Sequence, residues 1–69
     1  MRLSARNQIK GTVIGVITGA TTAHVRVDIG AGQVMTSSIT NDAVDELGIK
    51  RGSKVTVVVK ASDVMIGVD

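Results

Sequence analysis

The segment from Thr22 to Ile29 constrains the fold more than any other part of the chain. Apolar residues at every second position alternate there with polar ones: Ala23, Val25, Val27 and Ile29 against His24, Arg26 and Asp28. Successive side chains of a strand point to opposite faces, so this alternation predicts a strand with one buried and one wet face. Gly30-Ala31-Gly32 follows and predicts a hairpin turn, with Gln33 to Ile39 returning as the next strand.

Three further strands and one helix are expected around this hairpin. Asn7 to Ile17 is rich in β-forming residues, and Gly11 and Gly15 within it suggest bends, bulges or close backbone approach. Thr40 to Leu47 predicts a short helix, capped by Thr40 or Asn41 and ended by Gly48. Lys54 to Lys60 is a valine-rich strand, and Val64 to Val68 predicts a last short strand.

The order β-β-β-α-β-β predicts an all-β fold, a five-stranded barrel of the oligonucleotide/oligosaccharide-binding (OB) type with one short helix. Residues 1–69 form a single domain in this interpretation. The first and fourth strands carry apolar residues on both faces, which indicates a subunit interface. A buried parallel sheet is the competing explanation, but it needs helical crossovers for which the chain has no room.

A chain of 69 residues without Cys, Phe, Tyr or Trp has an aliphatic core and no disulfide to strengthen it. Small domains of this kind commonly gain stability by association, so a homo-oligomer is expected. No apolar run is long enough to span a membrane, and no signal-peptide core follows Met1, so the cytoplasm is the expected location.

Several functional classes lack the residues that they require. No glycine-rich phosphate loop, nucleophile elbow or metalloprotease helix is present, so an enzyme is not expected. His24 is the only histidine and the chain has no Cys, so we expect no direct metal ligands. The Asp45-Glu46 pair does not place both carboxylates on one helix face and is interpreted as solvated surface.

Two short polar clusters remain as candidates for chemistry. Ser4-Ala5-Arg6-Asn7 lies near the start and Lys60-Ala61-Ser62 near the end. In each cluster a cation and a hydroxyl are two positions apart, so an extended chain points both to one side. Two such pairs can surround a small anion with charge-assisted hydrogen bonds. The competing interpretation, that single arginines and strand-end lysines are merely solvated, applies better to either cluster alone than to both together.

Small residues and hydroxyl groups complete this anion-binding hypothesis. Ala5 and Ala61 would let an oxyanion approach the backbone, and Ser62 can cap a short helical turn whose N–H groups bind anions. Ser38 or Thr40 could join such a site. For these two residues, strand propensity and helix capping are the alternative explanation.

Together these residues resemble the molbindin family of small Mop-type molybdate-binding proteins. The similarity lies in Ser4-Ala5-Arg6-Asn7-Gln8, in Ile39-Thr40 before the helix, and in Lys60-Ala61-Ser62 with the residues after it. It runs from Leu3 to about Val68, and neither main motif departs from the family pattern.

The resemblance implies a five-stranded barrel in a homohexamer, a trimer of dimers. It also implies molybdate or tungstate held at subunit interfaces, for storage or homeostasis, with no organic cofactor. On the family pattern, the oxyanion-binding residues are Ser4, Ala5, Arg6, Thr40, Lys60, Ala61 and Ser62.

Two other functions are weighed against oxyanion binding. An OB-like nucleic-acid-binding module is the main alternative, but such barrels stack bases on aromatic side chains, and this chain has none. The basic residues are also spread along the chain, with a net charge of only +2. The other is a purely structural module of a larger regulator or transporter.

Overall fold

A computed structural model describes residues 1–69 and shows an all-β fold with a single α-helix and one short 3-10 helix, η1. The elements are β1 (Asn7–Thr18), β2 (Thr22–Gly30), β3 (Gln33–Thr40), α1 (Asn41–Leu47), β4 (Lys54–Val59) and η1 (Ala61–Asp63). No helix is long and apolar enough to cross a membrane. The order of these elements confirms the predicted order of the first four strands and the helix.

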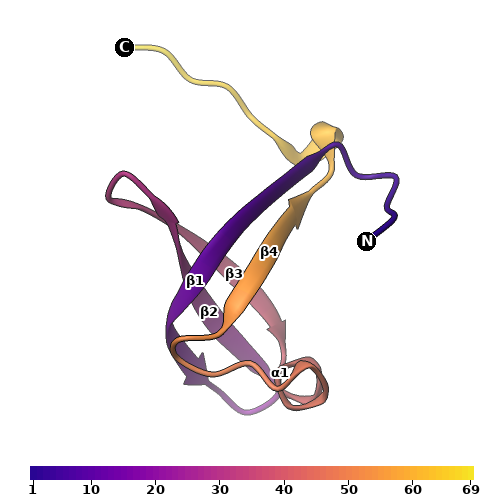
Figure 1. Ribbon diagram of the computed structural model, residues 1–69, viewed down its shortest axis with the longest axis vertical. Helices are drawn as coiled ribbons and strands as arrows, with labels where there is room; N and C mark the ends of the chain where they lie inside the picture. Colours follow the sequence, from indigo (N-terminus) through magenta and orange to yellow (C-terminus); the bar gives the residue numbers. More distant parts are fainter.

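The four strands form one curved antiparallel sheet in the order β3-β2-β1-β4 (Figure 1). The long strand β1 pairs with β4 along its first half and with β2 along its second half. The first half runs from Asn7 to Thr12 and the second half from Thr12 to Thr18. A bulge between Val13 and Gly15 interrupts the second ladder, and such bulges increase the local twist of a sheet.

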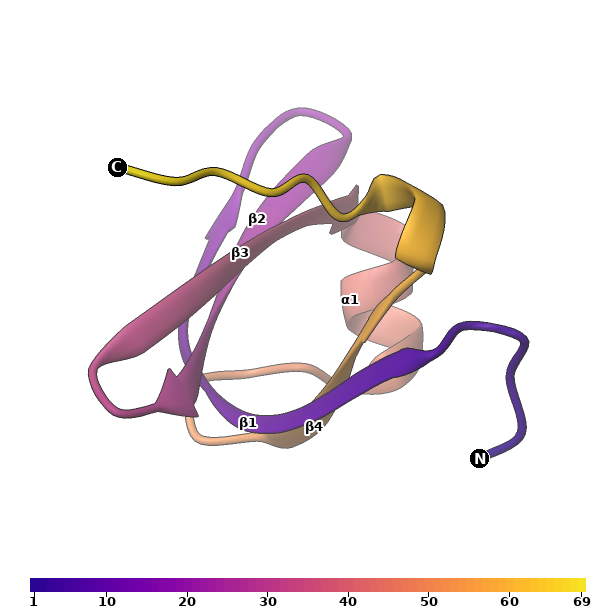
Figure 2. The ribbon, with the colours of Figure 1, turned by 90° about the horizontal axis from the view of Figure 1, so that it is seen from above.

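The core is built around β2. Figure 2 shows how the sheet curves, with α1 at one end of it. Ala23, Val25 and Val27 are buried, as their alternation predicts, and they pack with Val13 and Val44. Val44 belongs to α1, which covers one end of the sheet. The core is entirely aliphatic and small, since only six residues of the chain are buried.

The helix begins and ends as its sequence indicates. The Thr40 hydroxyl accepts a hydrogen bond from the Ala43 backbone N–H at 3.0 Å, the geometry of an N-cap. Gly48 ends the helix in the left-handed conformation, with φ at +63°. The predicted hairpin turn is also confirmed, because Gly30, Ala31 and Gly32 all have positive φ.

The fifth strand and the closed barrel were wrong predictions for the single chain. Residues Val64 to Val68 form no strand and leave the sheet as an extended segment (Figure 1). The sheet is therefore open between β3 and β4. Alternating side chains are a local property of the sequence, whereas a strand also needs a neighbour for its backbone, and this chain supplies none at that place.

Candidate functional site

The ladder between β1 and β4 brings the two polar clusters to the same end of the sheet. Asn7, the first residue of β1, pairs with Val59, the last residue of β4. Because the strands are antiparallel, the segment before Asn7 and the segment after Val59 emerge side by side (Figure 1). The two clusters are more than fifty positions apart in the sequence, and the pairing of β1 with β4 brings them to the same end of one chain.

The amino-terminal cluster is anchored by its amide neighbours. Asn7 Nδ2 donates to the Val59 carbonyl at 3.2 Å, which ties the start of β1 to the end of β4. Gln8 Nε2 donates to the Ala5 carbonyl at 3.5 Å. Ala5 is buried, while Ser4 and Arg6 on either side of it are exposed. The cation and the hydroxyl of this cluster therefore flank a fixed backbone position.

The carboxy-terminal cluster turns through η1. Asp63 N donates to the Lys60 carbonyl at 2.9 Å and Val64 N to the Ala61 carbonyl at 3.2 Å. Lys60 occupies the N-cap position and Ser62 lies inside the turn, so the prediction that Ser62 caps a helical turn was wrong. The reason is that η1 begins at Ala61, with only Lys60 between it and the end of β4, which is earlier than the sequence suggested.

The charged and hydroxyl donors of the two clusters are available to a ligand. Ser4, Arg6, Lys60 and Ser62 are all exposed. None of them takes part in the side-chain hydrogen bonds of the chain. The one carboxylate beside them in sequence belongs to Asp63, which is also exposed. Two cations and two hydroxyls in this arrangement suit a small anion that accepts hydrogen bonds from several directions.

Thr40 lies at the other end of the sheet from both clusters. It precedes α1, whereas Lys60 follows the far end of β4 (Figure 1). Its hydroxyl caps the helix, and its strand position is opposite Thr22. Within one chain the structure does not bring Thr40 to the other predicted site residues. Its hydroxyl reaches such a site only if a neighbouring copy presents it.

The remaining sequence candidates form no competing site. His24 is exposed on β2, opposite Ser38 on β3. No group of three or more His, Cys, Asp or Glu side chains is placed to hold a metal ion.

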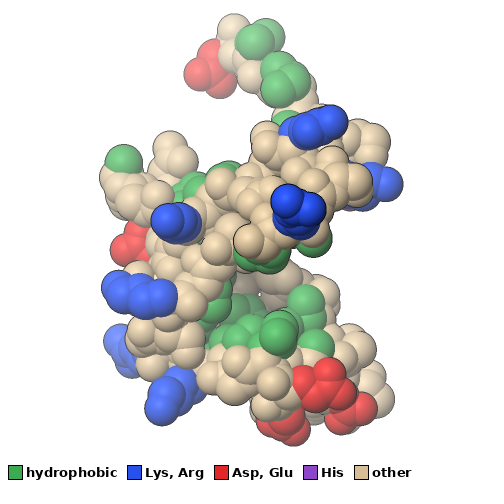
Figure 3. All heavy atoms as spheres, turned by 45° about the vertical axis from the view of Figure 1, so that its right-hand side comes forward, with side chains coloured by type: hydrophobic (Ala, Val, Ile, Leu, Met, Phe, Trp, Pro, Cys, Tyr) green, Lys and Arg blue, Asp and Glu red, His purple; other side chains and the backbone are tan.

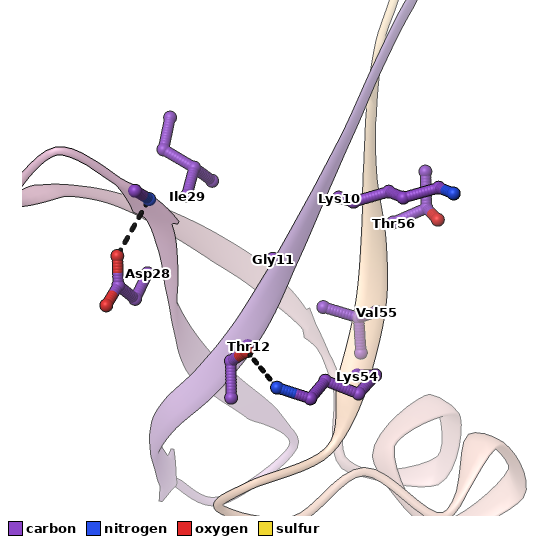
Figure 4. A pocket seen from close by; sticks show the side chains of 9 residues that line it. Lys10, Gly11, Thr12, Asp28, Ile29, Lys54, Val55 and Thr56 are labelled. Carbon is purple, nitrogen blue, oxygen red and sulfur yellow. Dashed lines mark hydrogen bonds between the residues drawn. The ribbon is translucent and has the colours of Figure 1, made fainter.

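A hollow that sequence reasoning missed lies on the sheet where β1 lies between β2 and β4 (Figure 4). Its polar lining residues are Lys10, Thr12, Lys54, Thr56 and the carboxylate-bearing Asp28. Lys54 Nζ donates to Thr12 Oγ1 at 2.9 Å, so this ammonium is already engaged with a residue opposite it in the ladder. Only the pairing of the strands makes these residues neighbours, and nothing in the sequence signals that pairing.

Comparisons with known proteins identify a family and several relatives of this chain. A family model described as the TOBE domain matches residues 3–66. Molybdenum-pterin-binding protein 2 of Clostridium pasteurianum is 52% identical over 66 residues, which cover 96% of this chain and 97% of the relative. A probable molybdenum-pterin-binding protein of Haemophilus influenzae is 42% identical over the full length of both chains.

Two solved structures have the same fold as this chain and are similar to it in sequence. MopII from Clostridium pasteurianum, in an apo form, superposes with a TM-score of 0.90 at 49% identity, over 97% of this chain and 100% of that one. The cytoplasmic molybdate-binding protein ModG, with molybdate bound, gives a TM-score of 0.95 at 46% identity. That match covers all of this chain and 49% of ModG.

Proposed function

Because this chain belongs to the TOBE-domain family, and within it to the molbindin type, we propose that it binds molybdate. The observation that carries the proposal is the β1–β4 ladder, which sets the exposed donors of the two clusters at one end of the sheet. Relatives named as molybdenum-pterin-binding proteins and a solved molybdate-bound neighbour support it. The role is binding, without chemical conversion of the ligand.

Each predicted residue has a distinct part in holding a tetrahedral dianion. Arg6 and Lys60 neutralise its charge, and the Arg6 guanidinium supplies donors that never deprotonate. The hydroxyls of Ser4 and Ser62 donate to its oxygens, and the backbone N–H groups of Ala5 and Ala61 complete the shell, with Thr40 contributed by a neighbouring copy. The protein contacts oxygen atoms only, so no side chain ligates molybdenum directly.

The finer features of the proposal follow from the ligand and the family. Tungstate has nearly the same shape and charge as molybdate and binds to the same donors. We propose that the sites lie at subunit interfaces of a homohexamer, a trimer of dimers, as the resemblance to the molbindin family implies. The position of Thr40 at the start of α1, away from the clusters of its own chain, is compatible with this arrangement. Storage or homeostasis of the oxyanion in the cytoplasm is the role that we propose, and one neighbour is described as cytoplasmic.

The names of several relatives raise a second candidate ligand, a molybdenum-pterin. A pterin is a flat ring system, and proteins commonly hold such rings against aromatic side chains. This chain contains no Phe, Tyr or Trp. We therefore propose the inorganic oxyanion as the ligand.

Isothermal titration of the purified protein with molybdate tests the function, with tungstate, sulfate, phosphate and a free pterin as parallel ligands. We expect saturable binding of molybdate and tungstate that sulfate and phosphate do not displace, because their smaller tetrahedra reach fewer donors at once. Absence of molybdate binding, checked by equilibrium dialysis, would overturn the proposal. Binding of the pterin alone would replace the oxyanion by the second candidate.

A further inference from the structure

Asn7 occupies a position of β1 where the core face of the sheet would ordinarily hold an apolar residue. By the two-residue period of a strand, it shares a face with Ile9 and with the core residue Val13. Both Asn7 and its ladder partner Val59 are half-buried. Asn is a poor strand former, and a polar group out of water lowers stability unless it is hydrogen-bonded. The needs of the fold alone therefore do not explain an Asn at this position.

The Asn7 side chain links the two segments that carry the polar clusters. Its Nδ2 donates to the Val59 carbonyl at 3.2 Å, and no other side-chain hydrogen bond joins these two segments. Arg6 directly precedes Asn7, and Lys60 directly follows Val59. Figure 3 shows Lys and Arg side chains at the surface beside the place where the carboxy-terminal segment leaves the body of the molecule. The hydrogen bond thus lies one residue away from each cation of the candidate site.

The distance between the two segments depends on this end of the ladder. The pairing of β1 with β4 stops at Asn7 and Val59, and neither Arg6 nor Lys60 belongs to a strand. The ends of a ladder open more easily than its middle. The Asn7 amide adds a bond at the point where the two segments would otherwise begin to separate.

A fixed distance matters because the competing ligands differ in size and not in charge. Molybdate and sulfate are both tetrahedral dianions, and sulfate is the smaller. Long cationic side chains would close around the smaller anion if the segments that carry them could move together. A site selects by size only where its groups are held to within about 0.5 Å of the required geometry. Any bond that fixes the two segments would therefore act on selectivity.

We propose that Asn7 is a positioning residue that sets the selectivity for molybdate over sulfate by holding the Arg6 segment at a fixed distance from the Lys60 segment. The inference rests on the proposed function and adds to it the origin of its selectivity. Asn7 acts through the two cations and does not itself contact the anion. The polar residue on the core face then has a reason that lies in the site.

Asn7→Val separates positioning from support of the fold. Valine is a strong strand former and suits a half-buried place on the core face, so Tm should stay equal or rise. The link to the Val59 carbonyl is lost in this variant. We expect the ratio of the sulfate Kd to the molybdate Kd to fall about tenfold, the size of effect that the loss of one hydrogen bond produces. Titration calorimetry measures both constants, with sulfate titrated alone at high concentration.

Thr12→Val is the matched control, because it makes the same kind of change at the other end of the same ladder. It replaces a polar residue of β1 by valine and removes a side-chain hydrogen bond to β4, the one from Lys54 Nζ to Thr12 Oγ1 at 2.9 Å. Neither residue belongs to the two clusters. We expect this variant to keep the wild-type ratio of the two constants.

The outcomes distinguish positioning from the other roles that Asn7 could have. An equal loss of affinity for both anions would make Asn7 a direct donor to any dianion and would overturn the inference. A lower Tm with an unchanged ratio would make it a support of the fold alone, with the same consequence. If the wild-type protein binds no molybdate, the proposed function fails and the inference fails with it. An unchanged ratio in Asn7→Val overturns the inference alone.

Spin labels test the positioning without any ligand. Leu3→Cys and Asp63→Cys place one label on each segment, at exposed positions outside the predicted site residues, in a chain that has no natural cysteine. The labelled chain is refolded with an excess of unlabelled chain, so that only distances within one chain are observed. We expect a narrow distance distribution that broadens in Asn7→Val and not in Thr12→Val. An equally narrow distribution in Asn7→Val would contradict the proposal.

Discussion

At the scale of single residues, the end of the β1–β4 ladder is flanked by two cations, one from each cluster, whose side chains have no hydrogen-bond partner within the chain. Arg6 and Lys60 are exposed and donate no hydrogen bond within the chain. An anion bound between them would relieve their mutual repulsion and gain charge-assisted hydrogen bonds. We therefore expect Arg6 and Lys60 to contribute to the affinity for the ligand and not to the stability of the fold.

Replacement of either cation separates these two effects. Arg6→Ala and Lys60→Ala should each weaken molybdate binding about tenfold to a hundredfold, the effect of losing a charged hydrogen bond of about 1.5–3 kcal/mol. Titration calorimetry measures the affinity, and circular dichroism checks the fold. Arg26→Ala is the control, because Arg26 is an exposed cation on β2 outside both clusters. Wild-type affinity in both variants would remove these residues from the site.

At the scale of elements, the close approach of β1 to β2 depends on the absence of a side chain at Gly11. A Cβ atom on Gly11 would lie 2.6 Å from Val27 Cγ1 and 2.7 Å from the Asp28 carbonyl oxygen. Neither neighbour can yield easily, because Val27 is buried in the core and the oxygen belongs to the backbone. Gly11 thus lets β1 approach β2 closely, next to where β1 changes its pairing from β4 to β2.

Gly11→Ala should lower the free energy of unfolding by about 1–3 kcal/mol, the usual effect of overpacking. Thermal denaturation would show this as a fall in Tm of several degrees in a domain of this size. Gly15→Ala is the matched control, since its Cβ would meet nothing within 4 Å and its φ is not positive. Equal melting temperatures for the two variants would show that β1 is free to shift away from β2.

The elements also show how far the sequence alone could lead. The strand around Val25, the hairpin at Gly30 and the cap at Thr40 were predicted because each depends on residues close together in the chain. The glycines of β1 also indicated a bulge or a close backbone approach, and the structure has the bulge between Val13 and Gly15. The absence of a strand at Val64–Val68 was not predicted. It depends on what lies beside the backbone, and the same is true of the single end at which the two clusters meet.

At the scale of the whole molecule, binding at subunit interfaces would couple the ligand to assembly. Anything that binds the assembled form and not the free chain stabilises the assembly by mass action. Native mass spectrometry, with the protein diluted until it partly dissociates, should show a larger share of assembled chains after molybdate is added. Sulfate at equal ionic strength is the control for a general salt effect. An unchanged distribution under saturating molybdate would place the complete site within one chain.

The open edge between β3 and β4 has a consequence for the life of the protein in a cell. In the homohexamer proposed for this chain, neighbouring copies would shield the edges of these two strands, so the number of chains made in a cell would decide how many of them are shielded. Chains produced sparsely would keep bare strand edges, the feature on which proteases and chaperones act. Expression level would then set the lifetime of each chain as well as the number of chains.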